Sequence, residues 1–96
     1  MTRLVPLRIP AGWTVVTNAF AEDARDEDLL QLRAGALHLD LSWSGDRYRL
    51  ELSDEETTHV SVENPSADYV RDAIDLILGE LSRDAEPASL QRLLAV

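Results

Sequence analysis

The sequence predicts an α+β fold: an antiparallel β-meander of about five strands, covered on one face by a long C-terminal helix and followed by a short terminal helix. Three observations lead to this prediction. Apolar and polar residues alternate between residues 29 and 63, as in strands that bury one face. Two short glycine-containing turns separate the first three of these segments, so that their apolar residues can be paired in register. After residue 66 the apolar spacing changes to that of an amphipathic helix.

The central hairpin is predicted to turn at Gly45 and Asp46. A two-residue loop there pairs apolar residues on both strands: Trp43 with Tyr48, Leu41 with Leu50 and Leu39 with Leu52. Glycine in the first loop position suits a type II′ turn, which matches the twist of the strands. A slip of one residue would send every apolar partner to the other face. The agreement of all three pairs therefore favours this register.

A second hairpin is expected to turn at Ala34 and Gly35, between strands over 29–33 and 36–43. This turn would set Leu32 opposite Leu37 and Leu30 opposite Leu39. The same arithmetic continues into strands over 47–53 and 58–63. To keep the core in phase, Leu52 must face Val60, which leaves a three-residue loop with a bulge. The β-branched segment 13–20 is a further strand, beside either the second strand or the fifth.

Residues 64–81 are predicted to form the long helix, with Asn64 or Ser66 as its N-cap and Pro65 in its first turn. The face directed to the sheet comprises Val70, Ala73, Ile74, Ile77, Leu78 and Leu81. A short helix over 88–95 follows. Its three leucines, 90, 93 and 94, are too few to stand alone. They must dock on this domain or on a second copy of the chain.

Composition narrows the possible functions. Ninety-six residues make one domain, 1–96. The chain has no cysteine and no lysine, which excludes disulfides, thiolate metal sites, a P-loop lysine and a Schiff base. A net charge of −9 disfavours nucleic acid and anionic membranes and suits a basic protein partner. Without an apolar stretch that resembles a signal peptide or a membrane span, a cytoplasmic protein is expected.

The polar face of the predicted sheet holds the residues that invite a catalytic interpretation. The pairing arithmetic aligns the polar residues in three rows. The first row holds Gln31, His38, Ser53 and His59, the second holds Asp40, Glu51 and Ser61, and the third holds Ser42, Arg49 and Glu63. A serine beside a histidine and an acid suggests a hydrolase. An open sheet face, however, offers neither a pocket nor an oxyanion hole. We therefore predict no catalytic residue, no metal ligand and no cofactor, and keep a small hydrolase using His38, Ser53 and His59 as the weaker alternative.

Alternate loops of a meander gather at the same end of the sheet. The loop over 22–28, the turn at Asp46 and the start of the helix should therefore lie together. Eight acids would form an acidic cap there: Glu22, Asp23, Asp26, Glu27, Asp28, Asp46, Glu63 and Asp68. Such a cap can steer a basic partner towards the protein, as well as keep the protein soluble.

In size, charge and α+β layout the chain resembles small acidic bacterial immunity and antitoxin proteins, which neutralise a toxin by covering its active site. This resemblance implies a non-enzymatic binding protein that masks a basic partner. The alternative is a homo-oligomeric structural module, paired through an edge strand or through residues 87–96.

Overall fold

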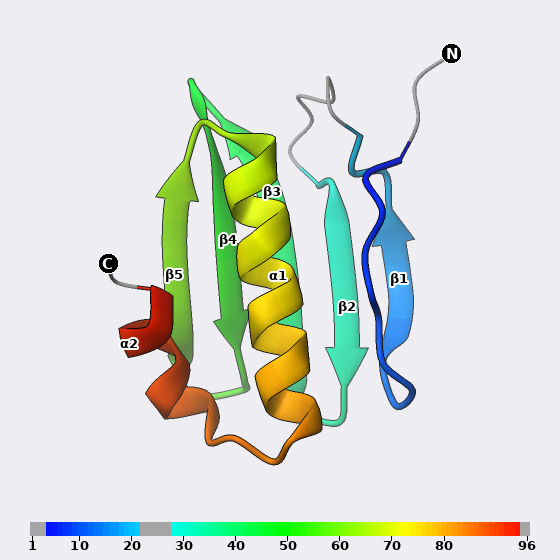
Figure 1. Cartoon of the computed structure of the whole chain (residues 1–96), viewed down its shortest axis with the longest axis vertical. Helices are drawn as coiled ribbons and strands as arrows, with labels where there is room; N and C mark the ends of the chain where they lie inside the picture. The colour runs from blue at the N-terminus through cyan, green and yellow to red at the C-terminus, as the bar shows by residue number, and fades with distance from the viewer. Residues whose placement is uncertain (1–3, 22–27, 95–96) are drawn as a thin grey trace.

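The computed structural model describes residues 4–21 and 28–94, and it confirms the predicted α+β architecture. A five-stranded antiparallel sheet has the order β1-β2-β3-β4-β5, and the long helix α1 packs across one face of it (Figure 1). The elements are β1 (Thr14–Asn18), β2 (Leu30–Ala34), β3 (Leu37–Ser44), β4 (Arg47–Ser53), β5 (Thr58–Asn64), α1 (Ala67–Ser82), the 3-10 turn η1 (Pro87–Ser89) and α2 (Leu90–Leu94).

The central hairpin has the predicted register. Leu39 faces Leu52, Leu41 faces Leu50, and Trp43 faces Tyr48. Gly45 has a φ of +68°, while Asp46 is not among the described residues with positive φ. A positive φ at the first loop position alone is the pattern of a type II′ turn, and it explains why glycine stands first.

The second hairpin differs from the prediction by two residues. Its turn lies at Gly35 and Ala36, not at Ala34 and Gly35. Leu32 consequently faces Leu39, and Leu30 faces Leu41. The predicted pairs with Leu37 and Leu39 were wrong because they placed glycine second in the loop. Gly35 has a φ of +61° and stands first, as Gly45 does in the other hairpin.

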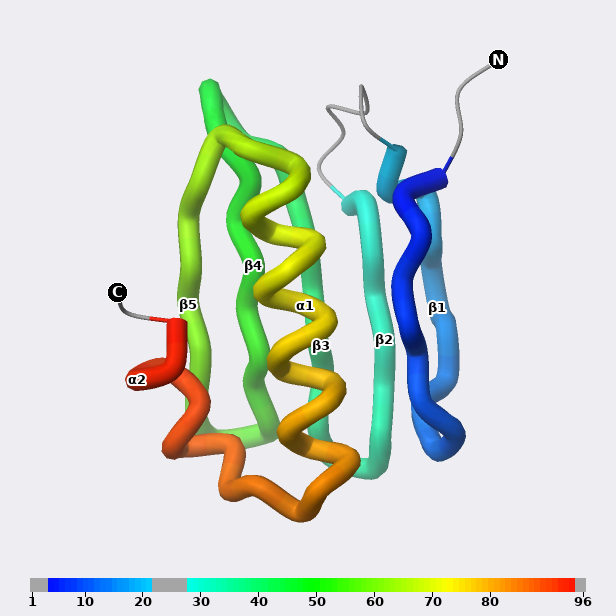
Figure 2. The backbone as a smooth tube through the Cα atoms, viewed as in Figure 1, coloured from blue at the N-terminus to red at the C-terminus, as the bar shows by residue number. Residues whose placement is uncertain are grey.

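β1 lies beside β2, which settles the position that the sequence left open. It is shorter than the predicted segment 13–20, and its register shifts between Val15 and Thr17, so Val16 forms a bulge. The chain before β1 runs down past it on the helix side of the sheet and then turns back into it (Figure 2). The backbone N–H of Val5 donates a hydrogen bond of 2.7 Å to the carbonyl of Phe20, and both side chains are buried.

The bulge predicted at the β4–β5 hairpin is present. Leu52 faces Val60 as expected, and the register shifts between Leu52 and Ser53, so that Ser53 pairs with Thr58. The backbone N–H of Asp54 closes the loop by donating to the carbonyl of Thr57.

Ser66 is the N-cap of α1, and its hydroxyl accepts a hydrogen bond from the N–H of Tyr69. Pro65 therefore precedes the cap, and its predicted place in the first turn was wrong. The residues of α1 that are buried against the sheet are Val70, Ala73, Ile74, Ile77 and Leu78. Leu81, also predicted on this face, is only partly buried.

The short terminal helix docks on its own domain. Leu90 and Leu94 are buried, and η1 and α2 both contact β5. Leu93 points away and remains 48% exposed. The sequence left open whether these leucines dock on the same domain or on a second copy of the chain. Two of the three, Leu90 and Leu94, dock on the same domain.

Three aromatic side chains pack together at the end of the core next to the β3–β4 turn. The ring centroids of Phe20 and Tyr48 lie 5.7 Å apart, and those of Trp43 and Tyr48 lie 4.8 Å apart. Both pairs of rings meet edge to face. Such geometry is favourable for aromatic pairs. The remaining buried sheet residues are Leu29, Leu30, Leu32, Leu39, Leu41, Leu50, Leu52, Val60 and Val62.

We expect Leu39→Ala to lower the free energy of unfolding by about 2–5 kcal/mol, because Leu39 is fully buried and the substitution leaves a cavity. Urea unfolding followed by circular dichroism measures this change. Leu93→Ala is the control, since its side chain is half exposed and little packing is lost. Equal effects of the two substitutions would contradict the assignment of Leu39 to the core.

Candidate functional site

Four described acids from separate segments lie at one end of the sheet, as the meander topology predicts (Figure 1). Asp28 precedes β2, Asp46 lies in the β3–β4 turn, Glu63 is near the end of β5, and Asp68 is in the first turn of α1. All four are exposed. The other predicted members of the cap lie outside the described residues: Glu22, Asp23, Asp26 and Glu27.

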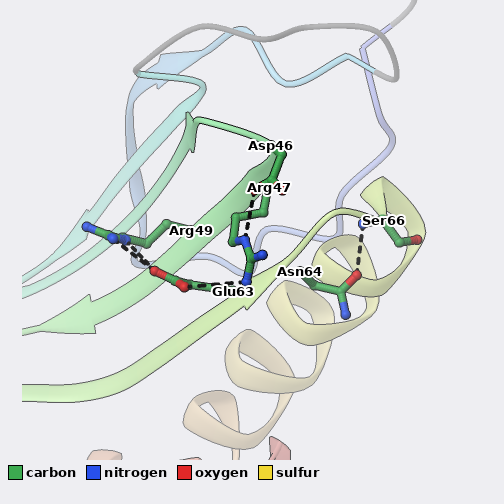
Figure 3. Close-up of polar contacts among 6 residues, drawn as sticks. All are labelled: Asp46, Arg47, Arg49, Glu63, Asn64 and Ser66. Atoms are coloured by element: carbon green, nitrogen blue, oxygen red, sulfur yellow. Dashed lines mark hydrogen bonds and ion pairs between the residues drawn. The ribbon is translucent and has the colours of Figure 1, made fainter.

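Two arginines, which the cap prediction left out, stand among these acids (Figure 3). The Nε of Arg47 lies 3.1 Å from Asp46 Oδ1, and its Nη1 lies 4.0 Å from Glu63 Oε2. The Nη2 of Arg49 lies 2.8 Å from Glu63 Oε1. The sequence held a signal for the last contact, because the pairing arithmetic set Arg49 opposite Glu63, as the structure has them.

These ion pairs change the charge that the cap presents. The hydrogen bond from Arg47 holds the pKa of Asp46 below its usual value, so Asp46 stays ionised while its charge is partly compensated. Asp28 and Asp68 take part in none of the ion pairs found among the described residues. Exposed ion pairs are weak and are readily exchanged for another partner. In the described part of the cap, Asp28 and Asp68 are thus the acids without a close ion pair, although Asp68 still interacts electrostatically with Arg71.

The start of α1 is held in place by a short chain of hydrogen bonds. The Oδ1 of Asn64 accepts a bond of 2.8 Å from the N–H of Ser66 (Figure 3). The hydroxyl of Ser66 in turn caps the helix by accepting a bond from the N–H of Tyr69. Both residues that the sequence offered as N-cap therefore accept such a bond: Asn64 stabilises the turn before the helix, and Ser66 is the N-cap itself. This arrangement fixes Asp68 at the positive end of the helix dipole, where a carboxylate is favoured.

The open face of the sheet carries the polar rows, and the first row differs from the prediction. Because the second hairpin is shifted by two residues, His38 faces Arg33, and Gln31 faces Asp40. The predicted place of Gln31 beside His38 was therefore wrong. Arg33 Nε donates to Nδ1 of His38 over 3.5 Å. The row of Asp40, Glu51 and Ser61 is formed as predicted.

His59 and Ser53 are not arranged as a catalytic pair. His38 does face Ser53, but the bulge places Thr58 opposite Ser53 in the position predicted for His59. The Nε2 of His59 lies 2.8 Å from Asp54 Oδ2, and the ring is only 14% exposed. No hydrogen bond found among the described residues joins Ser53 to either histidine. The acid that the sequence analysis did not consider, Asp54, is the one that engages a histidine.

Asp54 organises the β4–β5 loop. Its Oδ1 accepts hydrogen bonds of 2.8 Å from the N–H groups of Glu56 and Thr57, and its Oδ2 contacts His59. The bond from Glu56, followed by those from His59 and Thr57, lowers the pKa of Asp54 to about 2. A short acid that accepts backbone N–H bonds two and three residues ahead is typical of a turn. We therefore assign Asp54 and His59 a structural role.

A shallow hollow of about 230 Å³ lies on the open face between β1 and β3. It is lined by Val16, Gln31, Leu32, Arg33, His38 and Asp40. Partial burial raises the pKa of Asp40, an effect that nearby His38 opposes and Asp28 reinforces. Asp28 lies shortly before Gln31, which faces Asp40, so the acidic end of the molecule adjoins this face.

A second, apolar groove of about 270 Å³ runs between α1 and α2. Its walls comprise Tyr69, Asp72, Ala73, Leu76, Leu93 and Leu94. The hydroxyl of Tyr69 donates a bond of 3.3 Å to the carbonyl of Leu94, which ties the two helices together.

Within residues 4–21 and 28–94, no three His, Asp or Glu side chains come together as a metal site would require. No helix in these ranges is both long and apolar enough to cross a bilayer.

A scan against protein-family models, a search of curated proteins and a search of solved structures each gave no match to this chain.

The role of Asp54 predicts a pH dependence of stability. Because its pKa falls from 3.8 in the unfolded chain to about 2 in the folded protein, its stabilising contribution is complete above pH 3.8 and is lost as the pH falls towards 2. We expect Asp54→Ala to lower the free energy of unfolding at pH 7 and to flatten its pH dependence between these two values. Chemical unfolding across a pH series measures both effects.

The control for this prediction is Glu55→Ala, which removes a neighbouring exposed carboxylate without touching the loop hydrogen bonds. We expect it to retain the wild-type pH dependence. An Asp54→Ala variant with an unchanged pH profile would show that the loop bonds do not hold the folded state.

Proposed function

We propose that the chain is a non-enzymatic binding protein that masks a basic partner protein, in the manner of a small immunity or antitoxin protein. One observation carries this proposal. Exposed acids from four separate segments lie at the same end of the sheet: Asp28, Asp46, Glu63 and Asp68. In the sequence, the residues immediately before Asp28 include four more acids, within 22–27.

The electrostatics suit such a role. With a net charge of −9, the chain attracts a basic surface from a distance and speeds the encounter. At contact, Asp28 and Asp68 are available without breaking an ion pair of the described residues. Asp46 and Glu63 can exchange exposed arginines of their own chain for those of the partner, at little cost.

The open sheet face supports binding more than catalysis. Its side chains are polar and paired in rows, and the ring nitrogens of both histidines already face Arg33 and Asp54. A surface of this kind can extend a contact that begins at the acidic end. The hydrolase alternative would need Ser53 to gain a histidine contact that the described structure does not contain.

The test is a pair of charge reversals with equal effect on net charge. Asp28→Arg with Asp68→Arg changes the cap, and Glu55→Arg with Glu56→Arg changes the opposite end of the sheet. Each pair removes two negative charges and adds two positive ones, so the net charge rises from −9 to −5 in both. Thermal unfolding first confirms that both variants fold.

Each variant and the wild type are immobilised and exposed to an extract of the source cells at low salt. The protein retained by the wild type is then purified, and its dissociation constant is measured by calorimetry over a salt series. We expect at least about tenfold weaker binding by the cap variant, little change in the control, and weaker wild-type binding at high salt. Equal losses in both variants would indicate non-specific attraction and would refute a role for the cap.

A further inference from the structure

The two edge strands of the sheet, β1 and β5, differ in what packs against them. At one edge, η1 and α2 lie against β5 (Figure 1). The side-chain Oε1 of Gln91 accepts a hydrogen bond of 2.9 Å from the backbone N–H of Ser61. A side chain from a neighbouring helix thus occupies a donor that an incoming strand would need. Covering an edge in this way is a common protection against strand pairing.

The other edge, β1, has β2 as its only strand partner among the described residues. Val15 is 47% exposed and Val16 is 54% exposed. Leu4, which forms an isolated bridge with Ala21 just beyond the end of β1, is 54% exposed. Three of the five large apolar side chains exposed in the described ranges therefore belong to this edge of the molecule.

β1 also lacks the features that usually protect an edge strand. Its sequence, TVVTN, contains no charged residue and no proline, and four of its five residues are β-branched. Each of the other four strands carries at least one charged residue, such as Arg33 in β2 or Glu63 in β5. The bulge at Val16 is the single protective feature that remains, and it shortens the stretch available for pairing.

We propose that β1 pairs antiparallel with β1 of a second copy of this chain, which joins the two sheets about a twofold axis normal to them. The distribution of charge favours this edge for a contact between two copies. Two copies that each carry −9 repel one another, and they can meet closely only where neither presents a charge. β1 is the strand that meets this condition, and its β-branched residues suit a strand pair.

The covered edge at β5 determines how far such an assembly can grow. When β1 of each copy is occupied, the outer edges of the joined sheet are the two β5 strands, both of which are covered by α2. The assembly therefore closes as a dimer with the same surface used on both chains. Because β1 has five residues, we expect a small interface with a dissociation constant of about 1–100 μM.

Salt distinguishes this contact from the proposed binding of a basic partner. Screening weakens the repulsion between two acidic chains, so dimerisation should strengthen as salt is added. Binding of a basic protein at the acidic cap should weaken under the same conditions. The two proposals can thus fail independently of each other.

Sedimentation velocity over a concentration series tests the dimer. We expect the mass of the wild type to rise from one chain to two and to stop there. Val15→Glu should abolish this rise, because a twofold axis brings the new carboxylate close to its own copy. Leu93→Glu is the matched control: it adds the same charge at a site with 48% exposure, against 47% for Val15, and should dimerise as the wild type does.

Single cysteines give a second readout that does not depend on disrupting the contact. The chain has no cysteine of its own, so Val15→Cys, Val16→Cys and Leu93→Cys each introduce a single thiol. Directly opposed residues of antiparallel strands lie within disulfide distance. We expect oxidation to link one of the two β1 variants and to leave Leu93→Cys unlinked. A wild type that stays monomeric at all concentrations, or a Val15→Glu variant that still dimerises, would overturn the proposal.

Discussion

The structure depends on one constraint, which is that the apolar side chains of neighbouring strands must all face the layer beneath α1. Leu39, Leu41, Leu50 and Leu52 form the centre of this layer, and all are fully or almost fully buried. Since successive residues of a strand point to opposite faces, burial of this set fixes the polar rows on the other side. The open face with its ion pairs, its hollow and its histidines follows from the same requirement.

That constraint allows a strand to slip by two residues but not by one, and the second hairpin illustrates the difference. Leu32 faces Leu39 where pairing by apolar pattern alone gave Leu37. Both registers keep the leucines on the buried face, so the pattern cannot distinguish them. The backbone of Gly35 does: at the first loop position it adopts a positive φ that alanine avoids. The turn residue therefore decided what the apolar pattern left undetermined, and His38 gained Arg33 as its neighbour.

The candidate site was predictable where it depended on topology and less so where it depended on side-chain geometry. The gathering of Asp28, Asp46 and Asp68 at one end follows from the up-and-down order of the strands. The compensation of Asp46 by Arg47 depends on a rotamer of a long exposed side chain, for which the sequence holds no clear signal. The role of Asp54 was likewise missed, because a bulge turned His59 towards it and away from Ser53.

The sequence by itself determined the α+β class, the central register and the helix face that meets the sheet, since these follow from local periodicity and turn chemistry. Only the tertiary structure decided which strand lies beside β1 and what covers the β5 edge. Those outcomes rest on contacts between residues far apart in the chain, such as Ser61 with Gln91 and Val5 with Phe20. Local patterns cannot specify such contacts, because their free energy appears only when the packed core brings the segments together.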